Sequence, residues 1–589
     1  MTRTKAVLLI LFTSLIIYSN SLGGEFIYDD EYFVVKNVQI RNLRNIPSFF
    51  THSSSGAFSG LSEDVYRPVT TVSYALDYFI WKLDTFGYHL ENVLFHSLNA
   101  ALLFLFLYAV FGNMELALFA GLLFACHPVQ TEVVSWISGR SSVLFLFFYL
   151  AALVFYVRFL KESKKIFYAA SVALYAVSLF SKEMAVSLPL VLIAYDIHFF
   201  NKDALKKKIL RYAPYVALTA FYVFTRYVVL QRLSQCDWWG ESPYYTFFTM
   251  SKVLVEYIKI LVLPVKLCAF YIIGISRSAA EGPVLAGLVL LLLSAAAAPF
   301  IFKRSRRASF AIWWFFITLI PVSNIVPLKA LMAERFLYLP SIGFAMLVAV
   351  IITSGGKRAL AAIFLAALVI AFGARTFARN EDWKDPVSIS KSILAVSPLN
   401  PWGYTSLGSA YLGKDRYADA EKALLKAIAL SRDYPSPRNA LGFCYLEMEK
   451  NDGAIKFFKE SLSLSPGDLE TMNMLGVAYA KVNRYDEAIK EFQASIKIDP
   501  VFVSAYLNLG AVYERRRQFD KALAEYRKVS LNTNSSQDVA LSYVRIGDVY
   551  AKGGDKAKAV EYYEKAIGLC GREFEELKKV TKERLASLK

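Results

Sequence analysis

The sequence predicts an all-α protein in two parts, a polytopic membrane helical bundle followed by an α-solenoid. Of the 589 residues, 56% are hydrophobic, against roughly 45–50% in soluble globular proteins. Apolar runs recur between residues 5 and 374, whereas the remainder has a soluble composition with a 34-residue period. We therefore expect a membrane domain over 1–374, a linker over 375–400 and a repeat domain over 401–589.

The formal net charge of +17 has a simple interpretation in such a protein. Lysine and arginine collect in the cytoplasmic loops of polytopic proteins and set their orientation. We therefore predict no nucleic-acid partner. The five cysteines show neither a CxxC pair nor metal-ligand spacing, so they neither demand nor exclude a disulfide.

About eleven apolar segments are expected to cross the membrane, several of them shorter than an ideal span. The first, 5–19, is not followed by a clear cleavage site, so we expect an uncleaved helix rather than a signal peptide. A polar loop over 20–88 comes next. The other segments are 90–111, 115–126, 141–160, 166–181, 184–200, 212–230, 281–302, 309–327, 335–354 and 358–374.

Basic clusters between these segments predict the orientation. They comprise Lys161–Lys165, Lys202–Arg211, Lys303–Arg307 and Lys357-Arg358. All four can face the cytoplasm if the charged segment 249–272 lies at the interface or re-enters instead of crossing. An odd number of crossings then places the loop 20–88 and the repeat domain on the extracytoplasmic face.

The repeat domain carries the clearest pattern in the sequence. Gly408, Gly442, Gly476 and Gly510 are 34 residues apart, and a fifth copy at Gly547 follows after three extra residues. Tyrosine and alanine positions keep the same period. This pattern is typical of the tetratricopeptide repeat, a helical hairpin that stacks into a solenoid. About five repeats are expected, and they suit protein binding rather than catalysis.

The functional prediction centres on Asp29 and Asp30, which directly follow the first apolar segment. Adjacent carboxylates at a membrane surface must stay hydrated, bind a cation or carry out proton chemistry, because burying them unpaired is costly. Other polar side chains fall in loops predicted on the same face. They are Arg67, His89, Glu91, His127, Glu132, Arg140, Lys182, Glu183, Glu334 and Arg335.

These residues lie in motifs whose order is informative. YDD, RPVTTVSYALDY, GYHLENVLFHSLNA, HPVQTEVVSWISGR, SKE and ERFLYLPS precede the repeats. Together they resemble the TPR-containing transmembrane O-mannosyltransferases, a cadherin-targeting type with many bacterial relatives. The resemblance covers nearly the whole chain. It implies a GT-C fold, a polyprenyl-phosphate sugar donor, a catalytic Asp in the first extracytoplasmic loop, and a bacterial inner-membrane location.

The residue chemistry fits a transfer of mannose or another hexose to protein hydroxyls. A carboxylate can accept the hydroxyl proton, and cations can neutralise the phosphate leaving group. We assign Asp30 as the base with Asp29 beside it, and Arg67, Arg140, Lys182 and Arg335 as phosphate contacts. No metal-ligand set is predicted. A divalent cation stays open as a cofactor, and the repeats are expected to bind the acceptor or a partner protein.

Structural interpretations exist for most of these residues. Asp29 and Asp30 can cap a helix, and His89 and Glu91 can be polar groups at a helix end. Glu132 can pair with Arg140, while Lys182-Glu183 and Glu334-Arg335 can be interfacial anchors. The rival function is a non-enzymatic membrane scaffold that recruits envelope proteins through its repeats. A transporter is a third alternative.

Overall fold

The computed structural model describes residues 2–54, 65–200, 203–355, 358–533, 535–571 and 574–588. Lys202 and Lys357 of the basic clusters lie outside the described residues. Helices and turns make up the described part of the chain, and no β-strand occurs in it, which confirms the all-α prediction. The chain divides into two compact units, Met1–Val396 and Ser397–Lys589.

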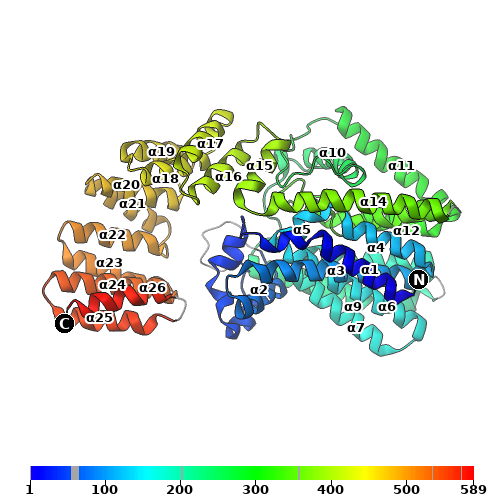
Figure 1. The fold of residues 1–589 in the computed structure, drawn as a ribbon, viewed down its shortest axis with the longest axis horizontal. Helices are drawn as coiled ribbons and strands as arrows, with labels where there is room; N and C mark the ends of the chain where they lie inside the picture. The colour runs from blue at the N-terminus through cyan, green and yellow to red at the C-terminus, as the bar shows by residue number, and fades with distance from the viewer. Residues whose placement is uncertain are drawn as a thin grey trace. The chain divides into compact units, whose positions relative to one another are not determined.

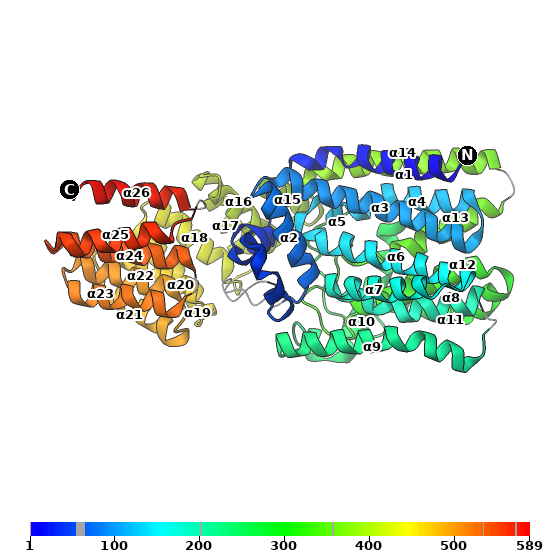
Figure 2. The ribbon, with the colours of Figure 1, turned by 90° about the horizontal axis from the view of Figure 1, so that it is seen from below.

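The first unit is a bundle of helices that run back and forth along one axis (Figures 1 and 2). Each apolar segment predicted from the sequence overlaps one of its helices. These are α1 (Arg3–Ile17), α3 (Thr85–Phe111), α4 (Met114–Cys126), α6 (Arg140–Glu162), α7 (Lys165–Ser181), α8 (Leu188–Phe199), α9 (Leu205–Leu230), α11 (Gly282–Arg304), α12 (Arg306–Leu319), α13 (Ser341–Ser354) and α14 (Arg358–Asn380).

These helices differ in length and composition, and only some of them are long and apolar enough to cross a membrane. Among the described residues, five helices are long and apolar enough to cross a membrane: α3, α6 with the turn before it, α9, α11 and α14. The bent pair of α4 and the segment after it makes a sixth if it is one span. The first unit therefore has the helices of a membrane domain, and the count of eleven crossings stays a prediction.

Further helical elements lie between these helices and after α14. They are η1 (Ser19–Gly23), η2 (Glu31–Val35), η3 (Val38–Arg41), η4 (Leu43–Phe50), α2 (Pro68–Trp81), η5 (Pro128–Gln130), α5 (Thr131–Ser135), η6 (Ile137–Gly139), η7 (Glu183–Ser187), η8 (Trp239–Glu241), α10 (Pro243–Val262), η9 (Ile320–Val322), η10 (Glu334–Leu337), η11 (Glu381–Trp383) and α15 (Pro386–Val396). In Figure 2 the elements of the first loop lie at the end of this unit opposite the N-terminus. The region predicted as a linker holds the end of α14, η11 and α15.

The first loop has a small core of its own. Asn37 and Asn42 cap η3 and η4 by accepting hydrogen bonds from the backbone N–H groups two residues on, at 3.1 and 3.0 Å. Val34 of η2 and Ile40 of η3 are fully buried in a cluster with Tyr88 and other apolar side chains. This packing fixes the loop, so the carboxylates that precede η2 have defined positions.

Close helix packing holds the bundle together where hydrophobic transfer contributes little. An added Cβ at Gly343 of α13 would lie 2.7 Å from the carbonyl oxygen of Ala311, so only glycine permits this approach to α12. Buried polar side chains also bond across helices. Asn99 of α3 donates to the Val143 carbonyl of α6 at 2.8 Å, which pairs the amide N–H group and the carbonyl away from water.

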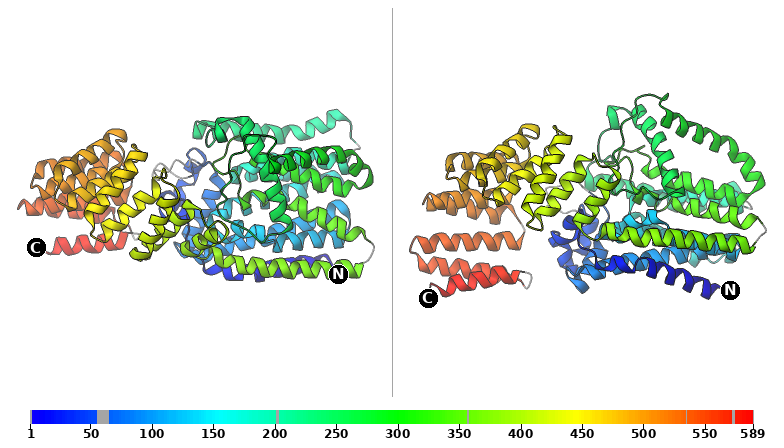
Figure 3. Two further views of the ribbon diagram at one scale, coloured as in Figure 1. Left: turned by 90° about the horizontal axis from the view of Figure 1, so that it is seen from above. Right: turned by 45° about the horizontal axis from the view of Figure 1, so that its top comes forward.

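The second unit consists of helix pairs that stack in chain order, coloured from yellow to red in Figure 3. The pairs are α16 (Pro401–Leu412) with α17 (Tyr417–Leu430), α18 (Ser436–Glu447) with α19 (Asn451–Leu464), α20 (Leu469–Lys481) with α21 (Tyr485–Ile498), α22 (Val503–Arg515) with α23 (Phe519–Asn532), and α24 (Ser536–Lys552) with α25 (Lys556–Leu569). Helix α26 (Glu575–Ala586) follows.

The periodic glycines explain these pairs. An added Cβ at Gly442 or Gly476 would lie 2.6 Å from the ring of Phe458 or Phe492 in the second helix of the same pair. Each glycine therefore makes room for a large side chain where two helices approach closely. The 34-residue period predicted in the sequence is a packing period of the structure.

Candidate active site

A cavity of about 240 Å³ lies in the first unit, bordered by segments from six parts of the chain. Among the residues predicted for the site, Asp29, Arg67, Lys182, Glu183 and Arg335 line it. They come from the first loop, from the turn between α7 and α8, and from η10. The structure therefore brings together five residues spread over about 300 positions of the sequence.

Asp30, beside Asp29, has a different environment. Its side chain is fully buried. One carboxylate oxygen accepts from the Ile27 N–H at 3.0 Å, and the other accepts from the N–H of Ser138 at 2.8 Å and from its hydroxyl. Burial raises the pKa of Asp30 to about 7, although these hydrogen bonds favour the charged form. Asp30 therefore anchors the loop to η6, and Asp29 is the member of the pair that reaches the cavity.

Two cavity arginines are held by glutamates. The Arg67 guanidinium donates to both carboxylate oxygens of Glu183, at 3.0 and 2.6 Å. Arg335 donates to Glu132 through its side chain at 2.5 Å and through its backbone N–H at 2.8 Å. The bidentate pair with Glu183 fixes the planar guanidinium of Arg67 before any ligand arrives, and Glu132 holds Arg335 through one guanidinium bond and one backbone bond. The alternative pairing of Glu132 with Arg140 is not what the structure contains.

Lys182 differs from the arginines because its amino group has no carboxylate within ion-pair distance among the described contacts. The side chain is 4% exposed, and Nζ donates to the Ser142 hydroxyl at 2.6 Å. Burial lowers the pKa of Lys182 to about 7, and repulsion from Arg67 and Arg335 adds to this effect, partly opposed by Glu183 and Glu132. The lysine is therefore poised to gain a proton when an anion binds beside it.

Arg140 lies outside the cavity lining. It is fully buried and bonds Asp77 at 2.8 Å, Glu91 at 2.6 Å and the side-chain oxygen of Asn92 at 2.6 Å. The glycine before it packs so tightly that a Cβ would lie 2.1 Å from the Val133 carbonyl oxygen. The guanidinium of Arg140, on α6, bonds Asp77 on α2 and both Glu91 and Asn92 on α3. Arg140 therefore links these three helices around the site.

Three further predicted residues have bracing contacts as well. Glu334 is fully buried and accepts two hydrogen bonds from Arg379 at 3.0 Å, and others from Cys268 and Tyr271. The His127 ring bonds the Leu261 carbonyl at 2.9 Å and the Val129 N–H at 3.2 Å. His89 is buried against Gly24. None of these lines the cavity.

Sequence reasoning missed several residues of the cavity. Arg232 and Lys329 add positive charge, and Gln235, Ser138 and Ser142 add polar groups. Arg232 and Gln235 belong to the polar stretch 231–248, which follows the apolar segment 212–230 on the predicted extracytoplasmic side, so this position could have indicated them. Lys329 lies directly after the apolar segment 309–327 and outside any polar motif, so the sequence did not indicate it. In all, five cationic and two acidic side chains line the cavity.

Over the described ranges, no three His, Cys, Asp or Glu side chains lie together in a metal-binding cluster.

Comparison with known proteins identifies relatives of both units. Models described as "TPR repeat" and "Tetratricopeptide repeat" match residues 476–516, and 405–468 with 502–570, respectively. The "Protein O-mannosyl-transferase F38B6.6" of Caenorhabditis elegans is 29% identical to this chain over 73% of it and 63% of the relative. The curated homologues are TMTC-family protein O-mannosyl-transferases.

Other TMTC relatives match in the same way. Human "TMTC3" is 25% identical over 73% of this chain and 52% of its own length, and Xenopus laevis "tmtc2" is 26% identical over 70% and 61%. The chain thus spans between about half and two-thirds of the TMTC relatives it matches. The family resemblance predicted from the sequence is confirmed, whereas the GT-C class and the bacterial setting stay predictions.

Solved structures resemble part of the chain. The "Crystal structure of MamA protein" is 25% identical with a TM-score of 0.26, covering 29% of this chain and 91% of that one. The "Crystal structure of YrrB: a TPR protein with an unusual peptide-binding site" is 18% identical with a TM-score of 0.26, covering 33% and 97%.

Proposed function

We propose that this chain is a membrane glycosyltransferase that transfers mannose from a polyprenyl-phosphate donor to hydroxyl groups of extracytoplasmic proteins. The observation that carries the proposal is the cavity, which is lined by Asp29 together with five cationic side chains. The TMTC homologues, which are named protein O-mannosyl-transferases, supply the reaction class.

The chemistry assigns a role to each kind of group. The acceptor oxygen forms a bond to C1 of the sugar while the bond from C1 to the phosphate oxygen breaks. Asp29 accepts the proton of the acceptor hydroxyl, and the polyprenyl phosphate leaves with the electron pair. A carboxylate in the cavity can do this, whereas the oxygens of Asp30 are committed to Ile27 and Ser138.

The cations act on the leaving group. Arg67 and Arg335 are oriented in advance by Glu183 and Glu132, so they lose little side-chain entropy when a phosphate binds. Lys182, Arg232 and Lys329 add charge to the same cavity. Fixed positive groups in a site with little water stabilise developing charge more strongly than the same groups in bulk solvent.

In this scheme the cationic side chains alone neutralise the charge of the phosphate. Removal of divalent cations with a chelator is therefore expected to leave sugar transfer unchanged. Loss of transfer on chelation, with recovery in magnesium or manganese, would place a divalent cation beside Asp29 instead.

The repeats and the orientation belong to the same proposal. A tetratricopeptide solenoid offers an extended surface for a polypeptide, so it would hold the acceptor or a partner protein. Charge placement supports an extracytoplasmic site, and the membrane in this proposal is a bacterial inner membrane. Helices α6, α7, α9 and α12 each have lysine or arginine at the end away from their cavity residues.

The direct test is transfer by the purified full-length protein in lipid nanodiscs. With a radiolabelled polyprenyl-phosphate mannose and extracytoplasmic proteins from a strain lacking the gene, we expect labelled protein and a hexose mass increment at serine or threonine. If no sugar is transferred from any polyprenyl-phosphate donor, while deletion of the gene leaves protein glycosylation intact, the scaffold function replaces the enzyme.

A further inference from the structure

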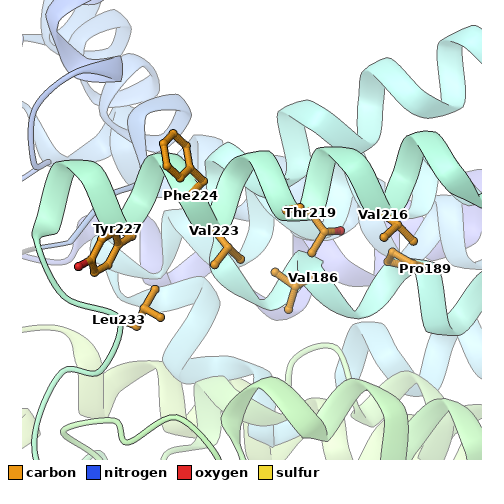
Figure 4. A pocket seen from close by; sticks show the side chains of 9 residues that line it. Val186, Pro189, Val216, Thr219, Val223, Phe224, Tyr227 and Leu233 are labelled. Atoms are coloured by element: carbon orange, nitrogen blue, oxygen red, sulfur yellow. The ribbon is translucent and has the colours of Figure 1, made fainter.

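Two hollows in the first unit differ in the side chains that line them. The larger, about 600 Å³, lies between η7 with α8 on one side and α9 on the other, and its lining is mainly apolar (Figure 4). Among its polar groups, the Thr219 hydroxyl already bonds the Tyr175 hydroxyl at 2.6 Å. The wall of the charged cavity instead includes Trp136. A tryptophan in such a wall can pack, donate a hydrogen bond and carry a cation on its face at the same time.

The turn before η2 is the first element that Trp136 contacts. The Asp30 N–H donates to the Ile27 carbonyl at 3.1 Å, which closes a turn around Tyr28 and Asp29. Tyr28 has a φ of 49°, in the left-handed region that a tyrosine adopts only at a cost in free energy. The indole N–H of Trp136 donates to the same Ile27 carbonyl at 3.2 Å. Trp136 therefore ties a strained turn to the segment between α5 and η6.

The backbone of Asp29 is held on its other side as well. Its carbonyl accepts hydrogen bonds from the N–H groups of Tyr32 at 3.0 Å and Phe33 at 2.9 Å, which belong to η2. With Ile27 fixed before it and η2 after it, Asp29 has a defined place in the cavity lining. Release of the Ile27 carbonyl would free the strained side of the turn and let the Asp29 carboxylate move.

Arg335 is the second group that Trp136 contacts. Its guanidinium lies 5.8 Å from the centre of the Trp136 ring, within the range of cation–π attraction, while Glu132 accepts a hydrogen bond from the same guanidinium. The ring itself is held firmly. Trp136 is 7% exposed, it stacks on Trp383 of η11 with ring centres 5.9 Å apart, and its carbonyl accepts from Asn92 at 2.8 Å.

We propose that Trp136 is a positioning residue for sugar transfer, an assignment that rests on the function proposed above. Its N–H holds the turn that directs Asp29 towards the acceptor hydroxyl, and its ring holds Arg335 beside the donor phosphate. One rigid indole thus sets the distance between the proton acceptor and a phosphate contact. This distance matters for turnover, because a misplacement of about 1 Å can cost on the order of 100-fold in rate.

Replacing the indole in two ways separates the two contacts by kinetics. Trp136→benzothienylalanine keeps the fused rings but has sulfur in place of the N–H. We expect it to lower kcat about tenfold, the scale of one lost hydrogen bond, with KM for the polyprenyl-phosphate donor unchanged. Trp136→Leu removes the ring as well, so KM for the donor should also rise about two- to fivefold.

The matched control is Trp314→benzothienylalanine. The N–H of Trp314 donates to the Leu339 carbonyl at 3.1 Å, and this fully buried side chain does not line the cavity. The control loses the same kind of hydrogen bond, so it should leave kcat unchanged even if its melting temperature falls. An equal loss of kcat in the Trp314 variant would show a general effect of folding and overturn the proposal.

Hydrogen exchange of the amides in 27–33 gives a second measurement that does not depend on turnover. These amides close the turn and η2, so Trp136→benzothienylalanine should speed their exchange about fivefold, whereas the Trp314 variant should not. Unchanged exchange, or an unchanged kcat, in the Trp136 variant would overturn the proposal while leaving the enzyme function in place. A protein that transfers no sugar with Trp136 intact would overturn the proposed function, and the exchange would still decide whether Trp136 holds the turn.

Discussion

Asp29 and Asp30 are neighbours in sequence but belong to two different groups of charged residues. Asp29 lines the cavity with Arg67, Lys182 and Arg335. Asp30 is buried, as are Arg140 and Glu334, and all three are enclosed by protein partners. The first group borders the cavity, and the second group braces the segments that carry the first. Residue type alone does not separate the two groups here, whereas their position relative to the cavity does.

The largest expected effect comes from the bracing group. Arg140→Ala leaves Asp77 buried without its cation and should destabilise the first unit by about 3–5 kcal/mol. Thermal unfolding in detergent measures this loss. The double variant Arg140→Met, Asp77→Leu removes both buried charges and should recover most of the melting temperature. If Arg140→Ala melts normally but loses transfer, Arg140 acts on the donor and the division between the two groups is wrong.

The next effect concerns the cavity arginines. Arg67→Ala removes an oriented guanidinium from the proposed phosphate site and should lower kcat/KM for transfer about 100-fold, the usual scale for one stabilising donor. Its melting temperature should fall much less than that of Arg140→Ala. Arg67→Lys should restore activity only in part, because an ammonium cannot reproduce the planar fork. Equal activity of the alanine and lysine variants would argue against a phosphate contact.

A smaller effect is expected from pH. Lys182 has a pKa of about 7, so its charged fraction falls as pH rises through neutrality. Because a phosphate favours the charged form, KM for the donor should rise up to about fivefold between pH 7 and pH 8. Lys182→Arg should abolish this dependence. Burial also raises the pKa of Asp30 to about 7. Asp30 is present in both the unmodified protein and Lys182→Arg, so the difference between their pH profiles reports on Lys182. Parallel pH profiles would contradict the assignment.

The smallest effect belongs to a charge in neither group. Glu31 lies next to the pair, and its side chain is 44% exposed, 3.4 Å from Lys36. Exposed ion pairs of this kind contribute about 0–1 kcal/mol. Glu31→Gln should therefore leave both the melting temperature and kcat/KM for transfer nearly unchanged, which makes it the matched control for carboxylate variants of this loop.

Much of the fold could be predicted because it follows from periodicity. The glycines at 34-residue spacing are where helices of one repeat touch, and apolar segments became helices of the bundle. The gathering of Asp29, Arg67, Lys182 and Arg335 could also be predicted, because alternating crossings place their loops at one end. These inferences need only the direction of the chain.

The division between cavity and bracing residues could not be predicted in the same way. Arg140 and Glu334 are buried because Asp77 and Arg379 pack against them, and these pairs are 63 and 45 residues apart in sequence. Asp77 sits inside an apolar stretch, where an isolated carboxylate was a signal of a buried partner. Only the three-dimensional packing shows which partner each charge has.

The most direct test of the account is the turnover of Asp29→Asn beside Asp30→Asn in the purified protein. The amide keeps the shape of Asp29 but cannot accept a proton, so kcat for mannose transfer should fall by roughly 10²–10⁴-fold with an unchanged melting temperature. Asp30→Asn places an NH₂ group against N–H donors and should instead lower the melting temperature, with turnover surviving in the folded fraction. An active Asp29→Asn together with a stable, inactive Asp30→Asn would contradict the assignment and make Asp30 the base.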